Sequence, residues 1–306
     1  MVNHTICGLK LSTKDLHPSR GRDKLLEIYP FNLSNREARV PTIDENKKNW
    51  EDYHWDTHGD IWSEGWGTVD MQWYGTLLPR LHQFVPAGTI LEIAPGYGRW
   101  THYLQNLGDS IIIVDLVQKC IEYCQERFRE SKNISYHVND GKSLAMIPNG
   151  SVDLIFSFDS LVHVEEDVIQ NYIGEFARVL KPGGYGFIHH SNLGEYADYF
   201  KFVDKLAFAH DALYRLRLID HYKHWRASSM TADKFDRFAS EAGLQVLTQE
   251  KINWGRSLLI DCISTFTTKN APHARTRRVI ANPHFRRESD YLRDLSGAYQ
   301  LTDKQK

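Results

Sequence analysis

The 306-residue sequence contains no run of eighteen apolar residues, and its formal net charge is only −2. A membrane-spanning helix needs about 20 mainly apolar residues, so none is expected. The balanced charge gives no overall bias toward nucleic acid or a membrane surface. The N-terminal segment also lacks the continuous apolar stretch of a signal peptide. We therefore expect a soluble, cytoplasmic protein.

Cysteine is scarce as well, with four residues in the whole chain. Cys120 and Cys124 lie four positions apart in a helical pattern, which suits neighbouring reduced thiols better than a disulfide framework. Internal repeats and low-complexity tracts are absent. The residue in excess is tryptophan, because five of the eight tryptophans fall between residues 50 and 73.

From residue 86 onward, short β-rich runs alternate with helical stretches. Five runs are expected to be strands: 88–95, 110–116, 134–140, 152–158 and 184–192. Strand–helix repetition at this spacing predicts a parallel, doubly wound α/β sheet. Two later β-rich runs joined by "WGR" have the form of an antiparallel hairpin and bring the expected total to seven strands.

The chain divides into three expected parts. Residues 1–85 are expected to form an N-terminal extension with an aromatic lid segment, and residues 86–270 the α/β domain. Within that domain, residues 195–228 have the pattern of a helical, aromatic insertion that would line the substrate pocket. Residues 271–306 hold six arginines and two lysines against four acids, so a basic C-terminal tail is expected.

Acidic residues follow the first four expected strands: Glu92, Asp115, Asp140 and Asp159. In open α/β sheets, ligands bind at the carboxyl ends of the strands, near the point where the strand order reverses. A single acid there is usually a solvated loop carboxylate, but four along one edge favour a binding site.

The first of these turns, "EIAPGYG", is rich in glycine, and Asp115 ends the second strand. A glycine-rich turn followed by such an acid is the general arrangement for a nucleoside, because the carboxylate can accept from ribose hydroxyls. A dinucleotide would also need a free helix N-terminus for its pyrophosphate, and Arg99 and Trp100 occupy that turn. An adenosine without phosphates fits better, which favours S-adenosylmethionine.

With these residues in place, the sequence resembles the class I S-adenosylmethionine-dependent methyltransferases over residues 86–268. The resemblance rests on "LEIAPGYG", "VDL", "NDG", "VDLIFSFDSLVHV" and "ARVLKPGGYGFI" in order, followed by the hairpin. Ala94 departs from the pattern, since the family most often has glycine there. The resemblance implies a Rossmann-like, seven-stranded, mainly parallel sheet and S-adenosyl-L-methionine as the cofactor.

Nine positions match the family's cofactor-contacting motifs: Glu92, Ala94, Gly96, Gly98, Asp115, Leu116, Asp140, Gly141 and Phe158. The resemblance implies that Glu92 lies near the methionine amino group and that the glycine-loop backbone runs along that moiety. It implies that Asp115 accepts from the ribose hydroxyls and Asp140 from the adenine amino group. Leu116 would either pack on the adenine or belong to the core.

Methyl transfer to a hydroxyl requires a base as the new bond forms, and histidine suits that role. The candidates are His163, His189 and His190, with Asp159 near enough to orient one of them. In cyclopropane-forming relatives a functional histidine follows the proline of the pre-strand motif by seven residues, and counting from Pro182 gives His189. Strand alternation then turns His190 toward the helix layer. No ligand spacing stands out for a metal, so no metal is expected.

The preferred acceptor is a sugar hydroxyl, free, nucleotide-linked or glycan-borne. Rings mixed with acids and histidines over residues 49–75 suit stacking against sugar faces, although the same rings could be core. A natural-product hydroxyl or amine is the main alternative. The "NPPY"-like signature of base-modifying enzymes is absent, so only the basic tail keeps RNA as a minor alternative. A catalytically idle cofactor-binding protein is the remaining one.

Overall fold

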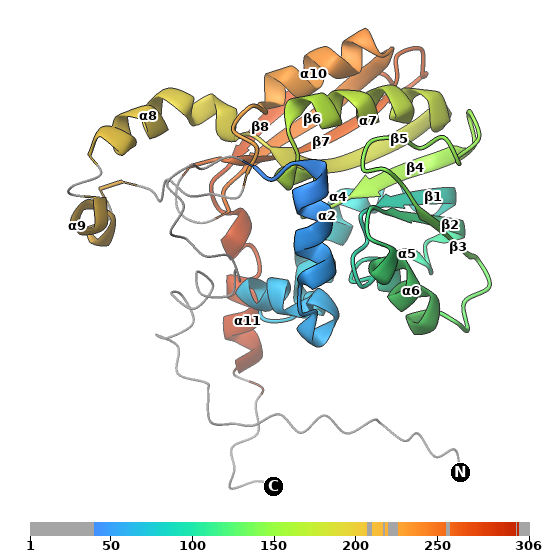
Figure 1. Cartoon of the computed structure of the whole chain (residues 1–306), viewed down its shortest axis with the longest axis horizontal. Helices are drawn as coiled ribbons and strands as arrows, with labels where there is room; N and C mark the ends of the chain where they lie inside the picture. Colours follow the sequence, from blue (N-terminus) through green and yellow to red (C-terminus); the bar gives the residue numbers. More distant parts are fainter. Residues whose placement is uncertain are drawn as a thin grey trace, which may run out of the picture. The chain divides into compact units, whose positions relative to one another are not determined.

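The computed structural model describes residues 40–206, 210–216, 218–219, 226–254, 258–297 and 299 (Figure 1). Residues 1–39, slightly less than half of the expected N-terminal extension, lie outside the described residues. Within the described part, the strands form one eight-stranded sheet in the order β3-β2-β1-β4-β5-β7-β6-β8. The strands are β1 Ala87–Ile93, β2 Gly108–Asp115, β3 Ile134–Val138, β4 Val152–Ser157, β5 Leu180–Ser191, β6 Leu244–Ile252, β7 Asp261–Thr268 and β8 Arg278–Asn282.

The pairing confirms the predicted doubly wound α/β sheet. β1 to β5 pair in parallel, and β7 pairs antiparallel with both β5 and β6. The strand order reverses between β1 and β4, so the loops that follow these strands form a crevice at their carboxyl ends.

Helices precede the sheet, connect its strands and follow it. They are α2 Ile43–Asp52, η2 Asp56–Trp66, α3 Val69–Gln72, η3 Trp73–Leu77, α4 Leu78–Leu81, α5 Thr101–Leu104, α6 Gln118–Arg127, η4 Leu161–His163, α7 Glu166–Val179, η5 Leu193–Tyr196, α8 Ala197–Lys205, α9 His210–Arg215, α10 Ala232–Glu241, η6 Phe285–Arg287 and α11 Asp290–Gly297. Thr42 and Glu45 form a capping box at the start of α2. The Thr231 side chain accepts from the Lys234 backbone N–H and caps the start of α10.

Alternate side chains of the central strands supply two cores, one on each face of the sheet. On one face, Leu91 and Ile155 pack with residues of α7 and α10. On the other face, Ile90 and Leu154 pack with residues of α5, α6 and the segments before and after the sheet. Figure 1 shows α7 and α10 on one side of the sheet, with α5 and α6 on the other.

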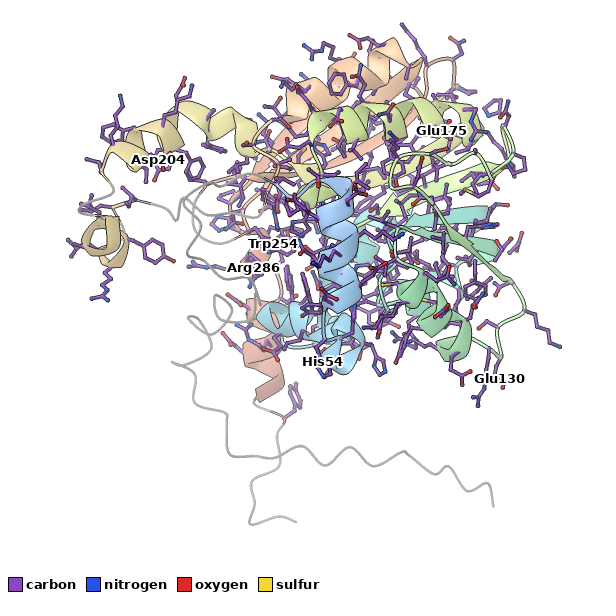
Figure 2. The ribbon with its side chains drawn as sticks, viewed as in Figure 1. His54, Glu130, Glu175, Asp204, Trp254 and Arg286 are labelled. Atoms are coloured by element: carbon purple, nitrogen blue, oxygen red, sulfur yellow. The ribbon has the colours of Figure 1, made fainter. Side chains whose placement is uncertain are left out.

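The C-terminal segment differs from the expected basic tail. Residues Arg278–Asn282 form β8, which pairs in parallel with β6 and makes eight strands instead of seven. Phe285 is fully buried, and Arg286 lies over the rings of Trp66 and Trp254. Figure 2 shows Arg286 beside Trp254. Two of the basic residues here contribute to pairing and packing, because Arg277 forms an ion pair with Asp233 and Arg286 lies against aromatic rings.

Arg80 ties this segment to the rest of the fold. Its guanidinium donates to carboxylate oxygens of Glu250 on β6 and Glu288 after η6, at 2.6 Å each. Burial lowers the pKa of the Arg80 guanidinium, but these hydrogen bonds outweigh burial and hold the pKa above its usual value. The segment around β8 is thus joined to β6 and α4 by buried charges as well as by apolar contacts.

Candidate functional site

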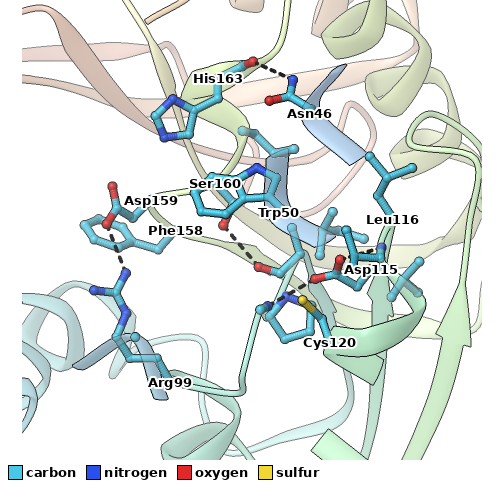
Figure 3. Close-up of a pocket in the computed structure, with 18 of the residues that line it drawn as sticks. Asn46, Trp50, Arg99, Asp115, Leu116, Cys120, Phe158, Asp159, Ser160 and His163 are labelled. Carbon is cyan, nitrogen blue, oxygen red and sulfur yellow. Dashed lines mark hydrogen bonds and ion pairs between the residues drawn. The ribbon is translucent and has the colours of Figure 1, made fainter. Parts of the chain in front are cut away.

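A cavity opens at the carboxyl ends of β1, β2 and β4, where the sequence predicted a site. Its floor comes from the turns after these strands, and α2 with part of η2 contributes a further wall (Figure 3). Six of the nine predicted cofactor residues line it: Ala94, Gly96, Asp115, Leu116, Gly141 and Phe158. Glu92, Gly98 and Asp140 are not part of its wall.

The turn after β1 has a backbone that strongly favours glycine. Ala94, Gly96 and Gly98 have φ values of 56°, 57° and 79°, in the left-handed region. A Cβ added to Gly96 would lie 2.7 Å from Cη2 of Trp55, and one on Gly98 would lie 2.5 Å from Cε2 of Phe128. Glycine is therefore required at both positions, and the turn keeps bare backbone at the cavity, as close approach of a ligand needs.

Asp115 sits at the end of β2 with its carboxylate at the cavity wall. Its Oδ2 accepts from the Gly96 N–H at 3.1 Å, and its Oδ1 accepts from the Val117 N–H at 2.9 Å. Burial raises the pKa of Asp115 to about 6, although these backbone hydrogen bonds act to lower it. A carboxylate held on two backbone donors has further acceptor positions, which fits the predicted ribose hydroxyls.

The raised pKa of Asp115 predicts a pH-dependent affinity for S-adenosylhomocysteine. Ribose hydroxyls donate to the ionised carboxylate, so binding favours its deprotonated form, and Asp115 causes no change in affinity well above pH 6. Below that pH affinity should fall, by up to about tenfold per pH unit. Titration calorimetry across about pH 5 to 8 measures this directly. Affinity that does not change over this range would contradict the role given to Asp115.

Glu92 lies beneath the turn and not on the cavity wall. Its Oε2 accepts from the Thr101 hydroxyl at 2.6 Å, while Oε1 is buried without a hydrogen-bond partner among the described residues. Burial raises the pKa of Glu92 to about 8, opposed by the hydrogen bond from Thr101. An unpartnered carboxyl oxygen is compatible with a nearby ammonium group of a ligand, because a cation would stabilise the ionised form.

The turn after β3 separates Asp140 from Gly141. Gly141 lines the cavity, whereas Asp140 is exposed and its Oδ1 accepts from the backbone N–H groups of Lys142 and Ser143. Oδ1 of Asp140 therefore stabilises this turn, and Oδ2 is the oxygen left to accept a hydrogen bond from a ligand.

Asp159 follows β4 and faces the cavity in an ion pair. Its Oδ2 accepts from Nη2 of Arg99 at 3.0 Å, and both side chains are nearly buried. The backbone of Asp159 has φ 63°, an uncommon value for a residue other than glycine. Figure 3 shows this pair beside Phe158, on the side of the cavity away from Asp115. Arg99 therefore belongs to the site, although the sequence offered it only as a block to pyrophosphate.

His189 does not lie where the sequence predicted. Its ring is fully buried, stacks on Phe158 with centroids 4.5 Å apart, and is not part of the cavity wall. Its Nδ1 accepts from the Asp159 N–H at 3.1 Å, which places the hydrogen on Nε2, 3.3 Å from Asp261 Oδ2. Because the basic nitrogen is occupied, His189 holds the Asp159 backbone and is not placed to take a proton from an acceptor.

Asp261, the neighbour of His189, is an ionised buried carboxylate. Burial would raise its pKa, but the charge of Arg226 and the hydrogen bond from His189 outweigh burial and lower the pKa to about 2. Arg226 Nε donates to Asp261 Oδ1 at 2.9 Å. Residues from β4, β5, β7 and the end of the insertion are thus joined behind Phe158.

His190 faces the opposite side of the sheet, as strand alternation predicted. Its ring stacks on Phe235 of α10 at 4.3 Å, and Nε2 lies 2.8 Å from the Ser264 hydroxyl. Burial lowers the pKa of His190 to about 4, so the ring is neutral and structural.

His163 is the candidate histidine that lines the cavity. It ends the η4 turn after β4, and its ring lies 6.3 Å from that of Trp50 between centroids. The Asn46 side chain donates to the His163 carbonyl at 3.3 Å, which ties α2 to this turn (Figure 3). Asn46, Trp50 and Ser160 also line the cavity. The sequence did not reveal Asn46, which stands in no motif, and Ser160 lies within "VDLIFSFDSLVHV" but has no role there that the pattern implies.

The aromatic segment contributes both to the cavity wall and to the hydrophobic core. Trp50, Trp55 and Trp62 line the cavity, whereas Trp66 and Trp73 are buried in the core. Trp55 stacks on Tyr97 with centroids 4.6 Å apart and planes 9° apart. The residues from Trp50 to Trp62 therefore form a lid over the turn after β1, and the later tryptophans anchor it.

The described residues of the insertion do not contribute to this cavity. No described residue between 195 and 228 is part of the wall. The Tyr196 hydroxyl accepts from the Leu259 backbone, so this end of the insertion packs on the start of β7 instead. Among the described residues, no group of three or more His, Cys, Asp or Glu side chains is arranged to hold a metal ion. No helix in the same part of the chain is long and apolar enough to cross a membrane.

The fold and the cavity have three features of an α/β protein that binds a nucleoside. The strand order of the parallel sheet reverses, a glycine-rich turn follows β1, and an acidic residue ends β2. Comparison with known proteins narrows this class. The family model described as "Methyltransferase domain" matches residues 90–184. A phosphoethanolamine N-methyltransferase of Triticum aestivum is 32% identical over 105 residues, which are 34% of this chain and 21% of that protein.

Two other comparisons cover more of the chain. A ubiquinone biosynthesis O-methyltransferase of Methylococcus capsulatus is 26% identical over 58% of this chain and 73% of that protein. The PH0226 protein structure from Pyrococcus horikoshii has a TM-score of 0.47 and 22% identity, over 63% of this chain and 88% of that one. The sequence motifs and the family model together indicate that residues 90–184 are a methyltransferase domain, and the motifs and the sheet order resemble those of the class I S-adenosylmethionine-dependent enzymes.

Proposed function

We propose that this protein transfers a methyl group from S-adenosylmethionine to a hydroxyl of a small molecule, preferably a sugar. The observation that carries the proposal is a single cavity wall that contains Asp115 and the glycine turn on one side and His163 on the other. Asp115 and the glycine turn would bind the nucleoside of the cofactor, and the histidine would accept the proton of the acceptor hydroxyl.

S-adenosylmethionine, when bound, supplies an electrophilic methyl group on its sulfonium sulfur. The turn at Ala94 and Gly96 and the Asp115 carboxylate would hold it at the carboxyl ends of β1 and β2. The lid then excludes water and orients the acceptor, since positioning supplies much of the rate in such a displacement.

His163 is the proposed general base. Its ring is nearly buried at the cavity wall, and the η4 turn that carries it is fixed by the hydrogen bond from Asn46. The acceptor O–H would donate its proton to a ring nitrogen of His163 as the oxygen forms its bond to carbon. Asp159 would help to orient the acceptor, with its backbone held by His189.

The three tryptophans of the lid support an acceptor with a flat or apolar face, as a sugar ring has. An amine acceptor is the second candidate, because aromatic walls also bind cations and one relative's name includes an N-methyltransferase activity. RNA is a weaker candidate acceptor, because two arginines of the C-terminal segment that could bind its phosphates already have protein partners. Arg277 pairs with Asp233, and Arg286 stacks on Trp66.

Replacing His163 with alanine should lower turnover by roughly 10²-fold or more, the scale of a positioned base, and leave S-adenosylhomocysteine affinity within about twofold. The matched control is His82→Ala, an exposed histidine far from the cavity wall. Methyl-transfer rates and calorimetry on the two variants separate catalysis from binding. Near-normal turnover of the His163 variant would refute the base assignment.

A transfer assay with labelled S-adenosylmethionine tests the function itself. The acceptor panel should contain sugars, nucleotide-sugars, phenols, amines and RNA, each matched with a derivative blocked at the reacting group. We expect label in a sugar and none in its blocked derivative. Label only in amines or phenols would move the protein to the second candidate class. Cofactor binding without transfer to any acceptor would indicate an idle cofactor-binding protein.

A further inference from the structure

Tyr172 of α7 is a buried tyrosine on the cavity wall that no motif of the sequence points to. It is 4% exposed and lines the same cavity as Leu116 and Gly141, the two residues that the family pattern puts beside the adenine. Its position in the middle of a helix, away from any strand end, explains why the sequence did not reveal it.

The hydrogen bonds around Asn139 fix the direction of the tyrosine hydroxyl. Asn139 Oδ1 accepts from the Gly141 N–H at 3.1 Å, so the amide group of Asn139 must point its Nδ2 the other way. That Nδ2 donates to the Ser143 carbonyl at 3.0 Å and to the Tyr172 hydroxyl oxygen at 2.9 Å. The Tyr172 oxygen is therefore an acceptor here, and its own hydrogen remains available to donate.

Three backbone donors of this turn are already used. The N–H of Gly141 donates to Asn139, and the N–H groups of Lys142 and Ser143 donate to Asp140 Oδ1. Among the described residues, no acceptor is recorded for the Tyr172 hydrogen, and burial raises the pKa of the phenol, which keeps that hydrogen in place. A buried O–H group without an acceptor at a cavity wall indicates an acceptor on the ligand.

We propose that Tyr172 reads the adenine of the cofactor by donating its hydroxyl hydrogen to ring nitrogen N1. This inference depends on the proposed cofactor site. Asp140 retains its Oδ2 for the neighbouring exocyclic amino group, as the family pattern implies. Together the two residues present one donor and one acceptor, which complement adenine. Hypoxanthine reverses both positions, because its N1 carries hydrogen and its exocyclic atom is a carbonyl oxygen.

The test compares S-adenosylhomocysteine with S-inosylhomocysteine by titration calorimetry on the full chain. Wild type should bind the adenine compound more tightly. Tyr172→Phe should lower that affinity by roughly three- to tenfold, the effect of one neutral hydrogen bond, and leave the inosine compound almost unchanged. The control Tyr185→Phe removes a hydroxyl on β5, outside the cavity wall, and should change neither affinity.

Four results are decisive. Selective loss for the adenine compound supports the assignment. Equal loss for both compounds would show that the hydroxyl only supports the turn through Asn139, and unchanged affinity would show that it contacts nothing; either result overturns this inference and leaves the cofactor site standing. Absence of binding by the wild-type chain would overturn both the cofactor site and the role of Tyr172.

Discussion

Replacing Asp115 with alanine is expected to abolish measurable binding of S-adenosylmethionine and its product. The carboxylate is the charged acceptor at the end of β2, at the cavity wall, and two ribose hydroxyls would donate to it. Hydrogen bonds to a charged group contribute about 1.5–3 kcal/mol each, so the loss should be roughly 10²- to 10⁴-fold in affinity. Titration calorimetry with S-adenosylhomocysteine measures it.

The matched control for this variant is Asp109→Ala. Asp109 is exposed at the opposite end of the same strand and should have no effect on affinity. Thermal unfolding of both variants is needed, because Asp115 also holds the N–H groups of Gly96 and Val117. A folded Asp115 variant with wild-type affinity would place the nucleoside elsewhere.

Deletion of residues 271–306 is expected to remove cooperative unfolding altogether. The deletion removes β8, the fully buried Phe285 and the Glu288 partner of Arg80. Loss of a buried phenylalanine costs about 3–5 kcal/mol, and the lost hydrogen bonds of β8 to β6 and of Arg80 to Glu288 cost about 0.5–3 kcal/mol each. Their sum is comparable to the whole stability of a typical domain, about 5–15 kcal/mol.

A single substitution makes the same point without a truncated chain. Phe285→Ala should lower the free energy of unfolding by about 3–5 kcal/mol, whereas Phe202→Ala, at an exposed position on α8, should change it little. Denaturant unfolding followed by circular dichroism gives both values. Cooperative unfolding of the deleted chain at wild-type stability would show that the C-terminal segment is an accessory after all.

The strands of the α/β domain were predictable because each is a buried apolar run between turn residues. β8 was not, because "RVIAN" is short, partly exposed and flanked by arginines. Its pairing with β6 depends on contacts that no local pattern carries. The same holds for Arg80, whose partners are 170 and 208 residues away in the chain.

The residues of the site also divide into those that the sequence predicted and those that it did not. Residues at strand ends, such as Asp115 and Asp159, were found because parallel strands bring their carboxyl ends to one edge. Strand alternation gave the correct sheet face for His190. It could not show that Phe158 lines the cavity while His189 stacks on Phe158 and stays out of the cavity wall. Asn46 and Tyr172 reach the cavity from helices, where only the folded chain reveals which side chains face a ligand.

The central claim is that the cavity holds S-adenosylmethionine and passes its methyl group to a small-molecule hydroxyl. The most direct measurement follows S-adenosylhomocysteine formation and acceptor methylation together, with wild type and Asp115→Ala in parallel. We expect equal amounts of both products from wild type, dependent on a sugar acceptor, and neither product from the variant. Methylated acceptor formed at the same rate by the Asp115 variant would contradict the claim, as would failure of wild type to methylate any hydroxyl acceptor.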